Sequence, residues 1–229
     1  MSLDEKAWQA VRGRIAAAAR MARRDPATVR LLAVSKGQPA ARLRDAYSLG
    51  QRAFGENYVQ EAAAKVAALG DLTGIEWHMI GPLQSNKTGV TAERFAWVQS
   101  VDRLKIAERL STARAAQQAP LNVCVQVNIS GEPAKSGVVP AAASALARAV
   151  AALPRLVLRG FMGMAEETRD VAEQRRQFRI LAELYAAARA DGLALDTLSM
   201  GMSADLEAAI AEGATMVRVG TALFGPREK

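Results

Sequence analysis

Cysteine and histidine are scarce in this sequence, and each shortage argues against a class of protein. The 229 residues include one cysteine, Cys124, so no disulfide can form within the chain and a reducing compartment, the cytoplasm, is expected. Cys124 lies in the apolar run 122–127, where a packed core thiol is favoured over a nucleophile. The one histidine, His78, falls inside a strand-like run, where a hydrogen-bonded core residue is favoured over a general base.

Long apolar runs and targeting signals are also lacking. No stretch approaches the ~20 apolar residues that cross a bilayer. The start of the sequence shows no basic segment leading into an apolar one. We therefore expect a cytoplasmic protein with no signal peptide and no membrane partner.

The charge balance is basic, with a formal net charge of +7 and a sequence pI of about 10.0. Such a balance suits nucleic acid, an acidic membrane or a phosphorylated small molecule. The densest basic group has no aromatic residues among its members, which are Arg20, Arg23, Arg24 and Arg30. This is typical of a solvated surface, so no nucleic-acid partner is expected.

Short runs rich in Val, Ile and Leu alternate with longer, Ala-rich amphipathic stretches. The short runs predict strands at Leu31–Ser35, Arg52–Gly55, Glu76–Ile80, Ala96–Ser100, Asn122–Asn128, Leu156–Met162, Thr197–Met200 and Met216–Gly220. The longer stretches predict helices, among them Tyr58–Leu69, Arg103–Gln118, Ala141–Ala152, Val171–Ala190 and Asp205–Glu212. A further helix, about Leu3–Met21, precedes the first strand, and the segment 83–95 is ambiguous because Gly89 interrupts it.

Repetition of strand and helix indicates parallel strands joined by crossover helices. About eight such units in this length fit a single (β/α)8 TIM-type barrel with an extra N-terminal helix. One domain over residues 1–229 is therefore expected. An open doubly wound sheet is the alternative, which is disfavoured because no Gly-rich dinucleotide fingerprint follows the first strand.

In such barrels the functional residues gather where strands end. Those positions here carry amides, hydroxyls, glycines and lysine, and they lack the carboxylate and histidine clusters of a metal or hydrolase site. Lys36 is the strongest candidate, because it follows the apolar strand 31–34 with only Ser35 between. A lysine beside a low-dielectric core is suited to form a Schiff base through its neutral amine. The alternative is a strand-end lysine whose ammonium extends to solvent.

A phosphate site is suggested by Ser203, which lies at or beside the N-cap of a predicted helix with Asp205 and Glu207 in its first turn. A hydroxyl and free backbone N–H groups at a helix start suit a phosphate. Gly220 and Thr221, after the eighth strand, would complete such a site. The alternative for this segment is plain helix capping.

Arg218 and Asn57 are further candidates. Arg218 points into the barrel if its neighbours Val217 and Val219 face the helices. A buried guanidinium needs an acceptor, and either the ring nitrogen of a cofactor or a barrel carboxylate would serve. Asn57, at the end of the second strand, either hydrogen-bonds a ligand or shapes its loop.

Several stretches of the chain resemble the YggS-type pyridoxal 5′-phosphate (PLP) homeostasis proteins, whose members share the alanine racemase N-terminal barrel. These stretches extend over nearly the whole chain and are Ala33–Lys36, Phe54–Glu61, Trp77–Lys87, Lys135–Gly137 and Leu198–Gly225. The last is the most specific. One departure is Gly37-Gln38, which stands where a threonine-containing pair is frequent.

The resemblance implies PLP as the cofactor, bound as a Schiff base to the strand-end lysine. It also implies residues that contact the phosphate, the pyridine nitrogen and the surroundings of the ring. No metal site and no catalytic residue is expected. The residues so implied are Lys36 for the Schiff base, Ser203, Gly220 and Thr221 for the phosphate, Arg218 for the nitrogen and Asn57 for the approach to the cofactor.

A carrier or buffer of PLP is favoured over an enzyme. A PLP racemase needs a second acid–base group opposite its lysine, and in alanine racemases a tyrosine of an additional domain supplies it. An arginine at the pyridine nitrogen disfavours protonation there and weakens the electron sink of many PLP reactions. We expect a monomer in PLP homeostasis, with PLP-dependent apoenzymes as recipients. The alternatives are a PLP-dependent amino-acid racemase and a PLP-free lyase that uses Lys36.

Overall fold

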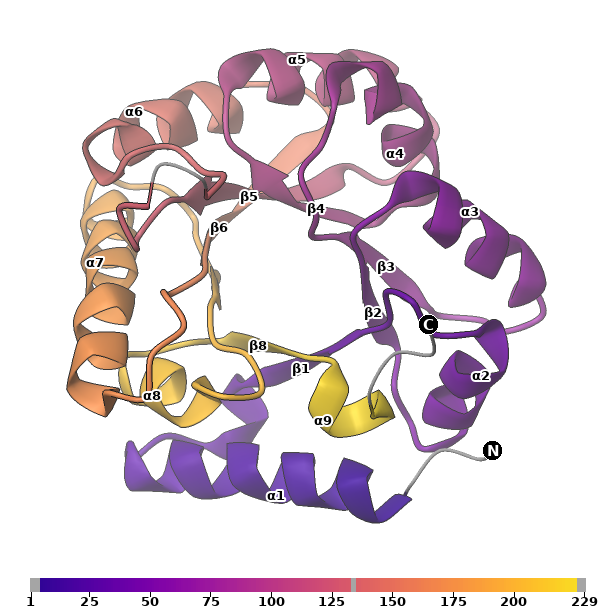
Figure 1. Cartoon of the computed structure of the whole chain (residues 1–229). Helices are drawn as coiled ribbons and strands as arrows, with labels where there is room; N and C mark the ends of the chain where they lie inside the picture. The colour runs from indigo at the N-terminus through magenta and orange to yellow at the C-terminus, as the bar shows by residue number, and fades with distance from the viewer. Residues whose placement is uncertain (1–4, 133–134, 226–229) are drawn as a thin grey trace.

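Eight parallel strands form a closed barrel in chain order, with β1 paired to both β2 and β8 (Figure 1). This computed structural model describes residues 5–132 and 135–225. The strands are β1 (Arg30–Val34), β2 (Ala53–Glu56), β3 (Glu76–Met79), β4 (Trp97–Val101), β5 (Leu121–Val127), β6 (Leu156–Gly163), β7 (Thr197–Ser199) and β8 (Met216–Val219). All eight overlap their predicted positions, so the predicted (β/α)8 barrel is confirmed.

Helices surround the strands in Figure 1. They are α1 (Glu5–Met21), α2 (Ala40–Ser48), α3 (Val59–Ala68), α4 (Thr88–Arg94), α5 (Leu104–Ala113), α6 (Pro140–Ala151), α7 (Val171–Ala190), α8 (Leu206–Ala211) and α9 (Thr221–Phe224). The longer helices bury an apolar stripe at helical spacing, as α5 does with Ile106, Ala107 and Leu110. In the described part of the chain, no helix has the length and apolar character needed to span a bilayer.

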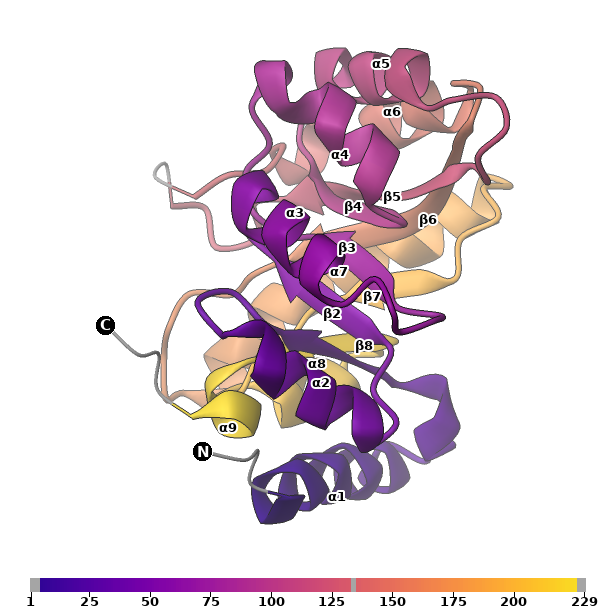
Figure 2. The same ribbon diagram turned by 90° about the vertical axis from the view of Figure 1, so that its right-hand side faces the viewer.

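The extra N-terminal helix is α1, which lies beside α8 and α9 (Figures 1 and 2). Trp8, Val11 and Ile15 follow helical spacing and are buried. The Trp8 ring meets the ring of Phe224 edge-on, with 6.4 Å between centroids. The predicted helix is thus confirmed from Glu5 onward, and its first two predicted positions lie outside the described residues.

The predicted helix 103–118 is too long, because α5 ends at Ala113. Arg114 adopts an extended backbone, and its buried guanidinium donates to the carbonyl oxygens of Ala92, Phe95 and Ala119. These acceptors belong to distant or later segments, so helical periodicity carried no sign of them. The ambiguous segment 83–95 holds a short 3-10 turn and α4, and α2 adds a helix that the expected set did not name.

Two small apolar clusters are distinct from the main core between strands and helices. Leu32, Ala53 and Met216 form one, and Trp97, Cys124 and Met162 form the other. Cys124 is fully buried, which raises the pKa of its thiol to about 12. The prediction of a packed core thiol is confirmed.

Candidate functional site

Lys36 lies two residues beyond the end of β1, at the carboxyl end of the barrel, and is half-buried. Hydrogen bonds hold the backbone of the residues on either side of it, Ser35 and Gly37. The backbone N–H of Ser35 donates to the Gly55 carbonyl at 2.9 Å and so continues the β1–β2 pairing. The N–H of Gly37 donates to Glu61 Oε1 at 2.5 Å, and Gly37 takes a φ of 70°, which favours glycine. The backbone around Lys36 is therefore held on both sides.

Behind Lys36 lies a buried cluster of charges that sequence reasoning did not identify. Lys65 Nζ donates to Glu56 Oε1 and Glu61 Oε1, each at 2.7 Å, and to the Ser35 carbonyl at 2.6 Å. Glu56 also accepts the Ser35 hydroxyl at 2.5 Å. Burial raises the pKa of Glu56 above its usual 4.5, although hydrogen bonds from Lys65 and Ser35 oppose this. Two features of the sequence could have indicated this cluster. Glu56 ends an apolar strand, and Glu61 and Lys65 are four residues apart on a predicted helix.

Arg218, in β8, points into the barrel as predicted and is 4% exposed. Its Nη1 donates to the Ser199 carbonyl at 2.7 Å and to Ser199 Oγ at 2.9 Å, and its Nη2 donates to the Gly163 carbonyl at 2.8 Å. Burial lowers its pKa to about 10, so the guanidinium stays charged at neutral pH. No barrel carboxylate pairs with it among the described residues. These contacts use three of its five N–H donors and leave two for a ligand.

Ser203 lies before the N-cap of α8, not at it. The helix begins at Leu206 with Asp205 as N-cap, and Glu207 is in its first turn. Asp205 Oδ1 accepts the backbone N–H of Met202 at 2.5 Å, so its carboxylate closes the preceding turn and does not cap the helix. The Ser203 carbonyl accepts Nη2 of Arg14 at 2.9 Å, while its hydroxyl has no partner in the described part of the chain.

The loop that carries Ser203 is fixed to both β8 and α8. The backbone N–H of Arg218 donates to the Gly201 carbonyl at 2.9 Å. Gly201 takes a φ of 91°, and a Cβ there would lie 2.5 Å from the Cβ of Ala209. A side chain at this position would push the loop away from α8.

Gly220 brings the end of β8 close to the end of β1. A Cβ on Gly220 would lie 3.1 Å from the carbonyl oxygen of Val34, two residues before Lys36. Thr221 follows, is exposed, and has no partner for its hydroxyl within the described residues. The predicted phosphate residues thus lie at the same end of the barrel as Lys36.

Asn57 follows β2 directly and is half-buried. The neighbouring loop after β3 passes so close that a Cβ on Gly81 would overlap the Asn57 backbone. The Asn57 amide has no hydrogen-bond partner in residues 5–132 and 135–225. It is available to a ligand at the carboxyl end of the barrel.

His78 is a core residue, as predicted. It is fully buried, its Nδ1 lies 3.0 Å from Gln99 Nε2, and its ring stacks on Trp97 with 5.0 Å between centroids. Burial, with a smaller effect of Arg30, holds the pKa of His78 well below its usual 6.5. A neutral, enclosed imidazole of this kind is not placed to exchange protons with a substrate at the rim.

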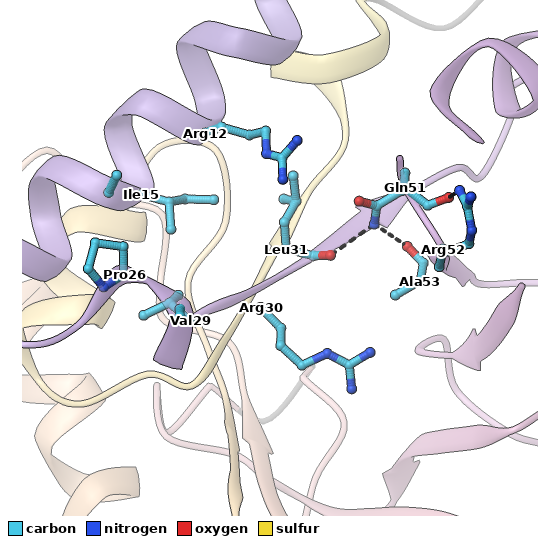
Figure 3. A pocket seen from close by; sticks show the side chains of 11 residues that line it. Arg12, Ile15, Pro26, Val29, Arg30, Leu31, Gln51, Arg52 and Ala53 are labelled. Atoms are coloured by element: carbon cyan, nitrogen blue, oxygen red, sulfur yellow. Dashed lines mark hydrogen bonds between the residues drawn. The ribbon is translucent and has the colours of Figure 1, made fainter. Parts of the chain in front are cut away.

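A cleft of about 520 Å³ lies at the opposite, amino end of the barrel. Figure 3 shows it between α1 and the starts of β1 and β2, where Arg12 extends from the helix over Leu31. The Gln51 amide donates to the carbonyls of Leu31 and Ala53 on its wall, at 2.9 and 2.6 Å. None of the predicted site residues lines this cleft, so it is separate from the candidate site.

Comparison with known proteins identifies the family. Residues 8–228 match the family described as alanine racemase, N-terminal domain. The chain is 60% identical over 218 residues to the pyridoxal phosphate homeostasis protein of Pseudomonas aeruginosa, covering 95% of this chain and 93% of that one. The chain belongs to the pyridoxal phosphate homeostasis protein family. The member from Escherichia coli K12 is 50% identical over 220 residues, covering 95% of this chain and 94% of the relative.

One similar protein has been solved with PLP bound. PipY of Synechococcus elongatus PCC7942, solved with PLP bound, superposes with a TM-score of 0.81 at 42% identity, covering 92% of this chain and all of that one. The predicted resemblance to PLP homeostasis proteins with an alanine racemase-type barrel is therefore confirmed.

Proposed function

We propose that this chain binds PLP at the carboxyl end of its barrel, with Lys36 as the Schiff-base lysine, and serves in intracellular PLP homeostasis as a carrier or buffer. The observation that carries the assignment of Lys36 is its half-buried position two residues after β1, between two residues with fixed backbones. Relatives named for PLP homeostasis and a PLP-bound relative support the cofactor.

The donors at this end of the barrel fit PLP. PLP carries three groups that a site must accommodate: an aldehyde, a phosphate dianion and a pyridine nitrogen. The aldehyde condenses with an amine. Within the described residues, the hydroxyls of Ser203 and Thr221 and the amide of Asn57 have no hydrogen-bond partner, and hydroxyl donors suit the phosphate. Gly220 lets the end of β8 approach Val34 closely. Arg218 has spare donors for the nitrogen.

A carrier fits the site better than an amino-acid racemase. The Arg218 guanidinium, still charged at neutral pH, would keep the pyridine nitrogen unprotonated and weaken the electron sink. Two of the three tyrosines are committed to backbone carbonyls, Tyr47 to Thr73 and Tyr185 to Leu195. Tyr58 is 65% exposed. We therefore propose delivery to PLP-dependent apoenzymes by a cytoplasmic, single-domain monomer.

Absorption spectroscopy tests the binding. Titrating the protein with PLP should produce a near-visible Schiff-base band, which Lys36→Ala abolishes and Lys105→Ala, on the exposed face of α5, retains. Survival of the band in Lys36→Ala would refute the assignment. Exchange of amino-acid α-protons in the PLP-loaded wild type, lost in Lys36→Ala, would favour the racemase.

A further inference from the structure

Inside the barrel, four polar side chains form a continuous hydrogen-bonded column. Arg218 of β8 donates to Ser199 Oγ of β7 at 2.9 Å, and Ser199 Oγ donates to Gln99 Oε1 of β4 at 2.6 Å. Gln99 Nε2 lies 3.0 Å from His78 Nδ1 of β3. Ser199, Gln99 and His78 are fully buried. Buried polar groups cost stability unless paired, so a column of this kind calls for an explanation.

The donors and acceptors in the column have one consistent order. A guanidinium can only donate, so Ser199 Oγ accepts from Arg218 and keeps its own proton for Gln99 Oε1. The Gln99 amide nitrogen then faces two acceptors, His78 Nδ1 and Met216 Sδ, the latter at 3.2 Å. His78 Nδ1 is therefore an acceptor, and the proton of the neutral ring resides on Nε2.

The column ends near a carboxylate. His78 Nε2 has no hydrogen-bond partner among the described residues and lies 3.9 Å from Glu76 Oε2. This carboxylate oxygen accepts the Trp97 indole N–H at 3.1 Å. Glu76 also pairs with Arg30, at 3.0 Å, beside the cleft at the amino end. All donors in the column thus point from Arg218 towards Glu76, and dipoles aligned in this way strengthen one another.

We infer that Ser199 and Gln99 are positioning residues, which hold the buried Arg218 guanidinium so that its two spare donors face the cofactor site. The hydrogen bond that it donates to Gln99 Oε1 sets the orientation of the Ser199 hydroxyl. This hydroxyl and the Ser199 carbonyl then accept both hydrogen bonds of Arg218 Nη1 and hold that nitrogen in place. Without the hydroxyl, Arg218 loses one of three anchors and Gln99 Oε1 loses its donor. The inference rests on the proposed function only in that it places the cofactor beside Arg218.

The single histidine makes the column observable. Labelling with ¹⁵N-histidine gives one imidazole in the whole chain. At neutral pH we expect Nδ1 to resonate as an unprotonated nitrogen and Nε2 as a protonated one. Ser199→Ala should shift the Nδ1 resonance. The matched control Ser100→Ala should leave it in place, because Ser100 is also buried but its hydroxyl has no partner among the described residues.

PLP titration supplies the second measurement. Ser199→Ala should weaken PLP binding about tenfold and shift the Schiff-base band, while Ser100→Ala stays within about twofold of wild type. A protonated Nδ1 in the wild type, or equal PLP affinities in the two variants, would overturn the inference. Failure of the proposed function would look different, because the wild type would then bind no PLP while its histidine resonances remained as expected.

Discussion

At the scale of single residues, the position after β1 was predictable and the groups that fix it were not. Lys36 could be found because a lysine two residues beyond an apolar run is a local pattern. Lys65 of α3 reaches Glu56 of β2 and the Ser35 carbonyl. Ser199 of β7 bonds to Gln99 of β4, 100 positions away. Such contacts leave no trace in local periodicity. His78 and Cys124, in contrast, were correctly predicted as core residues because burial follows from the strand pattern.

Glu56 gives a residue-scale prediction about pH. Its folded pKa is raised above the usual 4.5 by burial, so its contribution to stability is complete below about pH 4.5 and is lost as the pH rises through the folded pKa. The Glu56→Gln variant lacks this titration. The unfolding free energy of the wild type relative to Glu56→Gln should therefore fall between about pH 4 and about pH 7.

Denaturant unfolding at both pH values measures this difference. Glu108→Gln, on the exposed face of α5, is the matched control and should show a smaller change. A wild type that gains stability relative to Glu56→Gln on going to neutral pH would show that the sign is wrong.

At the scale of elements, the periodicity located the strands and most helix ends to within one or two residues but placed the end of α5 five residues too late. Strands were found because apolar β-branched runs bounded by polar residues are short and distinct. The end of α5 depends on Arg114 reaching carbonyls in and after α4. The start of α8, at Leu206, lies one residue from its predicted position. The support that α1 gives the Ser203 loop was also invisible, because Arg14 and Ser203 lie 189 positions apart.

Because Arg14 of α1 holds the loop that carries Ser203, we expect a change in α1 to alter binding at the proposed PLP site. Arg14 donates to the Ser203 carbonyl and pairs with Glu207, at 2.7 to 2.9 Å. Because the ion pair is partly exposed, Arg14→Ala should cost less than about 1 kcal/mol of stability. It should nevertheless weaken PLP binding several-fold, because the Ser203 loop loses an anchor.

The control for this prediction is Arg12→Ala, on the same helix, where no ion pair or hydrogen bond of Arg12 occurs in the described part of the chain. PLP titration and urea unfolding of both variants measure the two effects separately. Equal PLP affinities for Arg14→Ala and Arg12→Ala would show that α1 does not support the loop.

At the scale of the whole molecule, the two ends of the barrel differ in chemistry. The carboxyl end gathers the amine of Lys36, the hydroxyls of Ser203 and Thr221, the amide of Asn57 and the buried guanidinium of Arg218, which come from the ends of β1, β2, β7 and β8. The amino end carries the cleft beside Arg12 and Arg30. The sequence allowed the carboxyl end to be predicted as the functional one because a closed parallel barrel brings all its strand ends together.

Borohydride reduction of the PLP-saturated protein, followed by peptide mass mapping, tests the central claim most directly. Reduction converts a Schiff base into a stable secondary amine, so the labelled peptide reports the lysine that had condensed with PLP. We expect a single phosphopyridoxyl group on Lys36. A label on a different lysine, or no label after saturation with PLP, would contradict it.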